Sequence, residues 1–211
     1  VCGKTAAHTY TYEKVENTTD TIKATCSVCG DTYTVQLLAP TSEGGTLTYD
    51  GTAKAATTSI TDGNLGETVT VTYATLTDCT ESAYSEDAPK NAGSYRAKLA
   101  LGSGDNAVSI TVDYTIAKAT PTITWPEDQK NQFVTYTGNA VDVTKITAPT
   151  VTLLSDDTFS DSSKITYSYR KVTDGTASVD FISGLPADIG TYEIKASIPA
   201  EGNYTAAETA D

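Results

Sequence analysis

A five-residue pattern that occurs twice constrains the fold of this chain more than any other feature. Residues 91–95 read NAGSY and residues 188–192 read DIGTY. After each copy, apolar residues alternate with mostly polar ones, at positions 97, 99 and 101 and again at 194, 196 and 198. This period of two predicts a strand with one buried face, entered through a turn that needs a glycine.

A tyrosine at the start of a strand, directly after a turn, is typical of the tyrosine corner of immunoglobulin-like (Ig-like) sandwiches. In that corner the ring packs on the core and the hydroxyl bonds to backbone a few residues upstream. We therefore predict structural roles for Gly93 and Tyr95 in one sandwich, and for Gly190 and Tyr192 in a second.

Other landmarks recur in the same order and support two tandem sandwiches. Residues 46–51 (TLTYDG) correspond to 133–138 (FVTYTG), and residues 68–73 (TVTVTY) correspond to 164–169 (KITYSY). No segment has a helical period, and short strands separated by turn signals favour an all-β fold. We predict Ig-like β-sandwiches over residues 37–118 and 119–211, joined at Pro121.

Residues 1–36 are predicted to form a separate, zinc-ribbon-like unit. The sequence VCG occurs at 1–3 and 28–30, and two strands are expected between them, at 8–12 and 21–25. A hairpin flanked by Cys-x-x-Cys-Gly knuckles is the construction of a zinc ribbon. The ligands of a structural zinc would be Cys2, His8, Cys26 and Cys29.

The zinc site has an alternative interpretation, because one cysteine of a complete ribbon is missing. The three cysteines can equally be simple or oxidised thiols, with His8 on a strand surface. The fourth cysteine, Cys79, is expected to be a buried, inert thiol. No other cofactor is required by the sequence.

Composition and charge exclude several classes of function. The chain has 211 residues, is 38% hydrophobic and carries a formal net charge of −13. That charge repels phosphate backbones and anionic lipids, so we expect neither nucleic acid nor membrane insertion. The chain begins at Val1 without a signal peptide, and we interpret it as a piece of a longer precursor.

The sequence does not predict an enzyme. Nucleophilic catalysis of the Ser/His/Asp or Cys/His type needs a histidine, and the only one is His8. Nucleophile elbows, phosphate loops and dinucleotide fingerprints are absent. Glycoside hydrolysis by two carboxylates that converge in space stays an open alternative. Solvated charge in loops is the commoner explanation of such acidic residues.

Three further candidate sites each have a simpler structural interpretation. Asp156, Asp157 and Asp161 could bind calcium, but a solvated acidic loop is favoured. Lys98 and Lys195 could form isopeptide cross-links, but strand alternation predicts that both are exposed to solvent. Trp125 could belong to a sugar-stacking platform, but core or interdomain packing is favoured.

The motifs resemble the tandem Ig-like repeats of large surface proteins in Gram-positive bacteria. These MBG-type repeats share a pattern YDG…NAGxY…YTIxKAxPTI, matched here by YDGTAK at 49–54, NAGSY at 91–95 and YTIAKATPTI at 114–123. The resemblance covers about residues 40–211, and the second copy diverges at YTG (136–138) and DIG (188–190). It implies repeats that extend a polypeptide from the cell wall, without a ligand site shared by the family.

We therefore expect a non-catalytic spacer or adhesive module of a secreted, cell wall-associated bacterial protein. Its partners would be neighbouring repeats of the same precursor, together with glycans or host surface proteins in the adhesive case, and it would be monomeric. The alternatives are a carbohydrate- or host-protein-binding module, marked by an exposed aromatic patch, and an accessory domain of a surface hydrolase.

Overall fold

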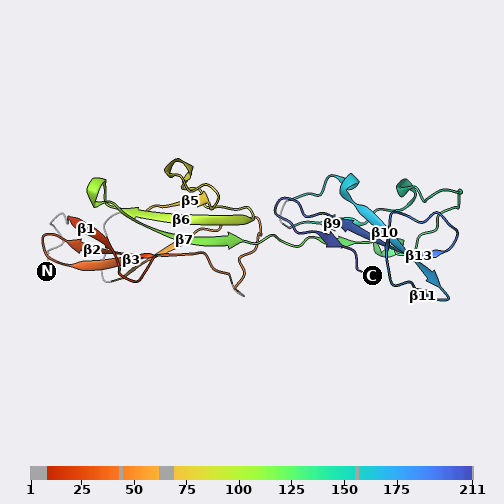
Figure 1. Ribbon diagram of the computed structural model, residues 1–211, viewed down its shortest axis with the longest axis horizontal. Coiled ribbons are helices and arrows are strands. Elements are labelled where there is room, and N and C mark those ends of the chain that lie inside the picture. Colours follow the sequence, from red (N-terminus) through yellow and green to blue (C-terminus); the bar gives the residue numbers. More distant parts are fainter. Residues whose placement is uncertain (1–8, 43–44, 62–68, 155–156, 211) are drawn as a thin grey trace. The chain divides into compact units, whose positions relative to one another are not determined.

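The computed structural model describes residues 9–42, 45–61, 69–154 and 157–210. These residues form antiparallel sheets, one of them curled into a half-barrel, with short 3-10 turns and no α-helix among them. The all-β fold expected from the sequence is confirmed. The chain divides into two compact units, Val1–Ala117 and Lys118–Asp211, which we call unit 1 and unit 2 (Figure 1).

The described residues of unit 1 form two antiparallel sheets and two 3-10 turns. The first sheet has the order β1-β2-β3-β4, from Tyr10–Lys14, Thr21–Cys26, Thr32–Leu38 and Thr57–Thr61. The second sheet has the order β5-β6-β7, from Val71–Thr75, Gly93–Leu101 and Val108–Ile116. The turns are η1, Glu81–Ala83, and η2, Gly104–Asn106.

An apolar core lies between the two sheets of unit 1. Alternate residues of β2, β3, β6 and β7 face it, because successive side chains of a strand point to opposite faces of a sheet. Its most deeply buried members are Ile22, Val35, Leu37, Leu99 and Ile110. Burying one such side chain is worth about 1.5–3 kcal/mol, so this core stabilises both sheets together.

The N-terminal hairpin is part of this core, which differs from the separate unit expected over residues 1–36. Ile22 and Ala24 are 0% exposed and belong to the same cluster as Leu99. Strand β3 also runs across the expected boundary at residue 36. The reason is that β2 and β3 each carry an apolar face, which the β5-β6-β7 sheet covers. The second boundary lies after Ala117, one residue before the expected position.

Unit 2 is also built from antiparallel pairs. Strands β8 and β9, Thr122–Thr124 and Thr150–Thr152, form a two-stranded sheet. The larger sheet has the order β11-β10-β13-β14, with β12 also paired to β10. These strands are β10 (Thr166–Thr173), β11 (Thr176–Ala177), β12 (Ile182–Ser183), β13 (Thr191–Ile198) and β14 (Ala207–Glu208). The 3-10 turns are η3 (Glu127–Gln129), η4 (Val143–Lys145) and η5 (Ser162–Lys164).

Unit 2 has an apolar core of its own. Its buried cluster contains Ile123, Ile165, Ala196 and Ile198. Trp125 and Tyr167 pack against this cluster with their ring centroids 6.4 Å apart, so the packing role favoured for Trp125 fits the structure. Among the described residues, no helix is long and apolar enough to cross a membrane.

Two of the recurring landmark segments do not form strands. Residues 133–138 contain no strand, and Phe133 is 99% exposed. Residues 46–51 contribute only an isolated parallel bridge between Thr48 and Ala117. Both segments carry β-branched and aromatic residues, but strand propensity needs a pairing edge as well as suitable side chains.

Candidate functional site

The two tyrosine corners have the geometry that the sequence pattern predicts. The Tyr95 hydroxyl donates to the carbonyl oxygen of Asn91 over 2.9 Å. The Tyr192 hydroxyl donates to the carbonyl oxygen of Asp188 over 3.1 Å. Each bond reaches back four residues across the turn that precedes the strand. Burial raises the pKa of the Tyr95 hydroxyl above its ordinary value, which favours the neutral, donating form.

The glycine of each corner is explained by ring packing rather than by the turn alone. A β-carbon on Gly93 would lie 3.2 Å from the Tyr95 hydroxyl oxygen. A β-carbon on Gly190 would lie 3.2 Å from the hydroxyl oxygen and two ring carbons of Tyr192. The tyrosine ring thus folds back over the glycine two residues earlier, and the absence of a side chain makes room for it.

The residues on either side of Lys118 are hydrogen-bonded in the same way, each within its own unit. In unit 1, Ala117 donates to the Leu47 carbonyl over 2.7 Å and accepts from the Tyr49 amide over 2.9 Å. In unit 2, Ala119 donates to the Asn203 carbonyl over 2.9 Å and accepts from the Thr205 amide over 2.8 Å. Both bridges are parallel.

Lys98 and Lys195 are not solvent-exposed, contrary to the expectation from strand alternation. Their side chains are only 17% and 19% exposed. Lys98 Nζ lies 2.6 Å from both carboxylate oxygens of Glu81, and Lys195 Nζ lies 3.2 Å from Glu208. The outer face is covered because Tyr84 lies beside Lys98 and Phe181 beside Lys195. Each lysine is held in an ion pair, and the isopeptide alternative stays untested.

The zinc prediction is not tested, because Cys2 and His8 lie outside the described residues. Cys26 is buried and Cys29 is half-buried, with the Gly30 amide donating to the Cys26 carbonyl over 2.9 Å. Among the described residues, no three His, Cys, Asp or Glu side chains are grouped for metal binding. Cys79 is half-buried rather than buried, and its Sγ donates to the Thr75 carbonyl over 3.3 Å.

Two of the acidic residues considered for calcium make structural hydrogen bonds. Asp157 accepts from the Tyr204 hydroxyl over 2.7 Å. Asp161 accepts from the Ser163 amide over 3.1 Å, and hydrogen bonds from Ser163 lower the pKa of the Asp161 carboxyl. Asp156 lies outside the described residues, so calcium binding stays a prediction.

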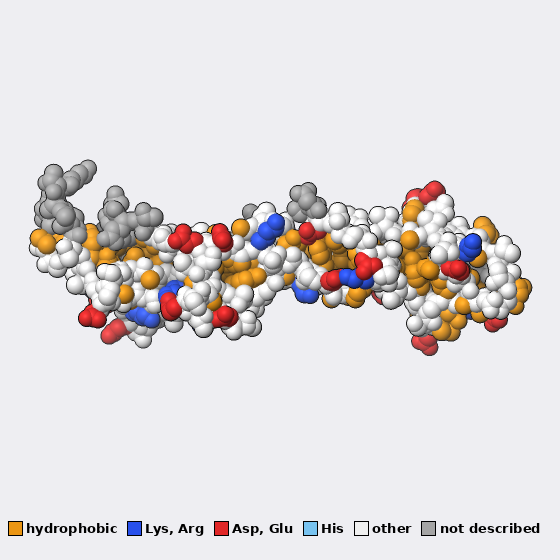
Figure 2. Space-filling view, turned by 90° about the horizontal axis from the view of Figure 1, so that it is seen from above, with side chains coloured by type: hydrophobic (Ala, Val, Ile, Leu, Met, Phe, Trp, Pro, Cys, Tyr) orange, Lys and Arg blue, Asp and Glu red, His pale blue; other side chains and the backbone are white. Residues whose placement is uncertain are grey.

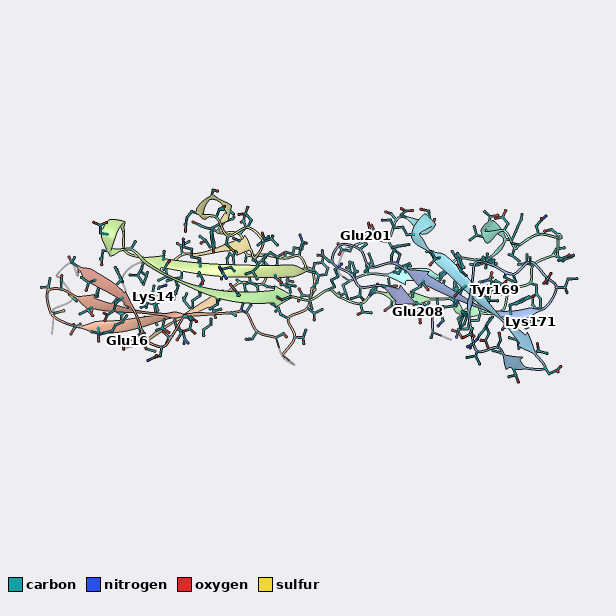
Figure 3. All side chains as sticks on the ribbon, in the orientation of Figure 1. Lys14, Glu16, Tyr169, Lys171, Glu201 and Glu208 are labelled. Atoms are coloured by element: carbon teal, nitrogen blue, oxygen red, sulfur yellow. The ribbon has the colours of Figure 1, made fainter. Side chains whose placement is uncertain are left out.

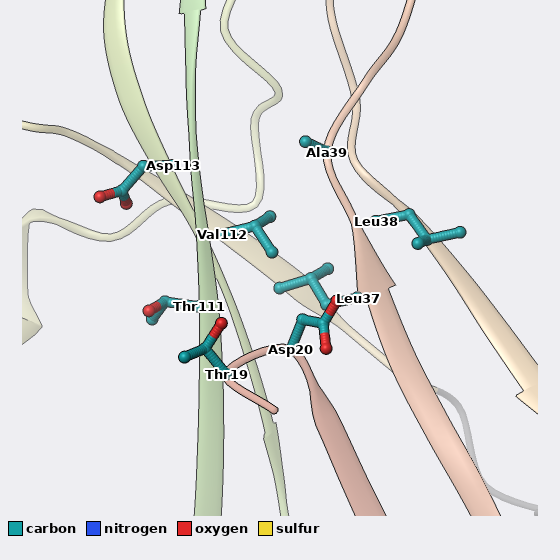
Figure 4. Close-up of a pocket in the computed structure, with 8 residues that line it drawn as sticks. All are labelled: Thr19, Asp20, Leu37, Leu38, Ala39, Thr111, Val112 and Asp113. Carbon is teal, nitrogen blue, oxygen red and sulfur yellow. The ribbon is translucent and has the colours of Figure 1, made fainter. Parts of the chain in front are cut away.

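A shallow cleft of about 530 Å³ opens between the sheets of unit 1, beside β7 and the ends of β2 and β3. In Figure 4, Leu37 and Val112 point toward each other across this cleft, whereas Asp113 points away from it. Asp113 is held by Arg96 through a bidentate pair of 2.6 and 2.7 Å. Asp20 accepts from Gln36 Nε2 over 3.1 Å. The carboxylates of Asp20 and Asp113 therefore already make structural contacts within unit 1.

A larger groove of about 1780 Å³ lies in unit 2. It runs beside residues 191–195 of β13, and Trp125, Phe133, Tyr136 and Ile189 contribute apolar side chains to its wall. Phe133, Tyr136 and Ile189 are 99%, 56% and 75% exposed. On the face that Figure 2 shows, apolar side chains lie exposed over unit 2 between separate acidic ones. Sequence reasoning missed this groove, because residues 133–138 were identified only as a landmark of the repeat.

Comparisons with known proteins found no relative. No family model matches the chain, and neither a curated protein nor a solved structure matches it.

Proposed function

We propose that the chain is a non-catalytic structural module of a secreted, cell-surface bacterial protein, built from two Ig-like β-sandwiches in tandem. Its role is to carry mechanical load and to hold other parts of the protein away from the cell wall. The observation that carries this proposal is the pair of parallel bridges at Ala117 and Ala119, on either side of Lys118.

The geometry of these bridges is suited to resist a force that stretches the chain. A pull along the chain reaches unit 1 through Ala117 and unit 2 through Ala119. In unit 2, Ala119 lies near the beginning of the unit and its partners, Asn203 and Thr205, lie near the end. When parallel neighbours are pulled in opposite directions, their hydrogen bonds are loaded together, whereas the bonds of an opening hairpin are loaded one at a time.

Three further observations support a repeat protein. The corner pattern recurs with equivalent hydrogen bonds at Tyr95 and Tyr192. The residues around 49–54, 91–95 and 114–123 resemble Ig-like surface repeats of Gram-positive bacteria. The net charge of −13 keeps neighbouring modules apart in solution. A structural zinc held by Cys2, His8, Cys26 and Cys29 remains part of the proposal, and metal analysis of protein purified without chelator tests it.

The proposal is tested by stretching single molecules of the full chain from its two ends. We expect two separate unfolding events, with the larger gain in length from unit 1, the longer of the two units. Gradual extension without a resolved force peak from either unit would overturn the load-bearing role.

The exposed aromatic side chains of the unit 2 groove favour a second candidate, a carbohydrate- or host-protein-binding module. Phe133 and Tyr136 stand where a sugar ring could stack. The test is binding of the full chain to a panel of glycans, mucin and extracellular-matrix proteins. Binding that Phe133→Ala abolishes would establish an adhesive module, and a silent panel with folded protein would reject this candidate.

A further inference from the structure

We propose that the outer edge of β7 in unit 1, the edge that faces away from β6, accepts an extended segment of a partner protein as an added strand. The segment carries apolar residues at alternate positions and a basic residue opposite Asp113. This inference concerns an interaction surface of unit 1 and does not depend on the load-bearing role. Strand addition of this kind obtains affinity from main-chain hydrogen bonds and specificity from alternate side chains.

One point of this edge is already paired. Ala117, directly after β7, donates to the Leu47 carbonyl over 2.7 Å and accepts from the Tyr49 amide over 2.9 Å. Backbone groups alternate between the two edges of a strand, so every second residue before Ala117 faces the same way. Within β7 these residues include Thr111, Asp113 and Thr115.

The pairing of β6 supports this assignment. The Leu76 amide donates to the Ser94 carbonyl over 2.9 Å, so the backbone groups of Ser94 face β5 and those of Tyr95 face β7. Tyr95 lies opposite Tyr114, whose backbone groups therefore face β6 and leave those of Asp113 on the outer edge.

The segment that is bridged to the end of β7 does not continue along the strand. Ser42 Oγ donates to the Thr46 carbonyl over 2.6 Å, and the Gly45 amide donates to the Ser42 carbonyl over 3.1 Å. These bonds close a tight turn just before the bridge. Among the described residues, no strand pairs with the outer edge at Thr111 or Asp113.

Only the beginning of β7 is held to β1 by side-chain hydrogen bonds. Asn106, two residues before β7, donates to the Tyr10 carbonyl over 3.0 Å and accepts from the Tyr12 amide over 3.4 Å. Strand β1 ends at Lys14, which Figure 3 labels together with Glu16 in the following turn. The cleft of about 530 Å³ lies beside the middle of β7.

This cleft provides apolar surface for a side chain of the added strand. Leu37 and Val112 point toward each other across it, and Leu38 and Ala39 also line it (Figure 4). Leu37 is fully buried, whereas Val112 is only half-buried. A residue opposite Val112 in the added strand lies on the same face of the sheet, so its side chain enters the cleft.

The other face of the same edge selects a basic residue. Asp113 points away from the cleft, and its side chain is 45% exposed although Arg96 of β6 pairs with it. A residue opposite Asp113 in the added strand lies on the same face as this carboxylate, on the side away from Arg96. A lysine or arginine there forms a second ion pair with Asp113. The net charge of −13 favours a basic partner over a second copy of this chain.

The sequence of β6 supplies the probe, because β6 already pairs with β7 and places a basic residue opposite Asp113. The hexapeptide SYRLKL repeats residues 94–99 with Ala97→Leu, so that its central leucine enters the cleft. In NMR spectra of the full chain we expect saturable shifts and slower hydrogen exchange at the Thr111 and Asp113 amides. The Val112 amide, which faces β6, is the internal control and should be protected with or without peptide.

Variant peptides separate the contribution of the edge from that of the charge. N-methylation at the arginine and the lysine blocks the amides that face β7 and should abolish binding, whereas N-methylation at the tyrosine and the central leucine should leave it in place. Glutamine in place of the arginine should weaken binding about fivefold, the size of an exposed charge pair. Asp113→Asn should remove that difference. Equal binding of both methylated peptides would overturn the proposal.

Other occupants give distinct results. Amides of Thr111 and Asp113 that are protected before peptide is added would show an edge already closed, and would overturn the proposal. A concentration-dependent dimer that the peptide disperses would assign the edge to a second copy of this chain, and would also overturn it. Failure to bind in protein whose Leu99 amide stays protected, as a sign that unit 1 is folded, would do the same.

Discussion

The ring of Tyr192 lies against Gly190 so closely that a β-carbon there would sit 3.2 Å from the hydroxyl oxygen and two carbons of the ring. Tyr95 lies against Gly93 in the same way. The glycine and the tyrosine of each corner therefore form one packing unit. The carbonyl oxygens of Asn91 and Asp188 complete it by accepting hydrogen bonds from the two tyrosine hydroxyls. The same arrangement of glycine, tyrosine and carbonyl therefore recurs in unit 1 and unit 2.

Replacing Gly190 with alanine should destabilise unit 2 by about 1–3 kcal/mol, the usual cost of overpacking. The cost arises from the Tyr192 ring, so it should largely disappear in a Tyr192→Ala background. A double-mutant cycle with denaturant unfolding measures this coupling. An equal cost of Gly190→Ala in both backgrounds would show that backbone conformation, and not the ring, requires the glycine.

The corner hydrogen bond can be removed without changing the ring. Tyr95→Phe should lower the stability of unit 1 by about 0.5–1.5 kcal/mol, because the Asn91 carbonyl loses its donor. Calorimetry of the full chain should show a shift in the unit 1 transition alone. Tyr136→Phe, at an exposed residue of unit 2, serves as the control and should shift neither transition.

The N-terminal hairpin should unfold together with the rest of unit 1. Ile22→Ala leaves a cavity in the core shared by both sheets and should cost about 2–5 kcal/mol. Hydrogen exchange should become faster both at Leu99, on the opposite sheet, and at Val35. The free energy of opening derived from exchange should fall by the same amount at the two residues. Faster exchange at Val35 with unchanged exchange at Leu99 would show that the hairpin is an independent unit.

Unit 1 should lose stability in acid. Hydrogen bonds from Lys54 and Thr52 lower the pKa of Asp50 to about 2, and Arg96 lowers the pKa of Asp113. A carboxyl with a lowered pKa stabilises the fold above its unfolded value, near 3.9, and this stability is lost as the pH falls through the folded pKa. The melting temperature of unit 1 should therefore drop between about pH 4 and pH 2.

Substituting both carboxyls tests that assignment. The variant Asp50→Asn with Asp113→Asn should begin with a lower melting temperature at neutral pH and lose less of it in acid. The measurement is calorimetry at a series of pH values. If the melting temperature of unit 1 fell with pH as steeply as in the unsubstituted protein, other groups of unit 1 would be responsible for the acid sensitivity.

Sequence periodicity predicted the strands whose apolar faces are buried. The alternation after Tyr95 correctly placed Ala97, Leu99 and Leu101 in the core, and the alternation after Tyr192 correctly placed Ala196 and Ile198 there. These correct predictions have one cause. A strand that is buried on one face must alternate apolar and polar residues, whichever strands it pairs with.

The incorrect predictions have a different cause. They concern features that depend on contacts between residues far apart in the sequence. The cysteine spacing suggested a separate unit, but the alternation of Ile22 and Ala24 in β2 was the better signal that this hairpin needs a covering sheet. Residues 133–138 resemble a strand and find no edge to pair with. Lys98 lies on the outward face as predicted, yet residues from a distant loop, Glu81 and Tyr84, cover it.

The load-bearing role is tested most directly by two proline substitutions. Ala117→Pro removes the donor to Leu47, and Ala119→Pro removes the donor to Asn203, with one hydrogen bond lost in each case. In single-molecule stretching of the full chain, Ala117→Pro should lower the unfolding force of unit 1 alone, and Ala119→Pro that of unit 2 alone. Each variant is the control for the other. Unfolding forces that neither substitution changes, in correctly folded protein, would contradict the proposal that these bridges carry the load.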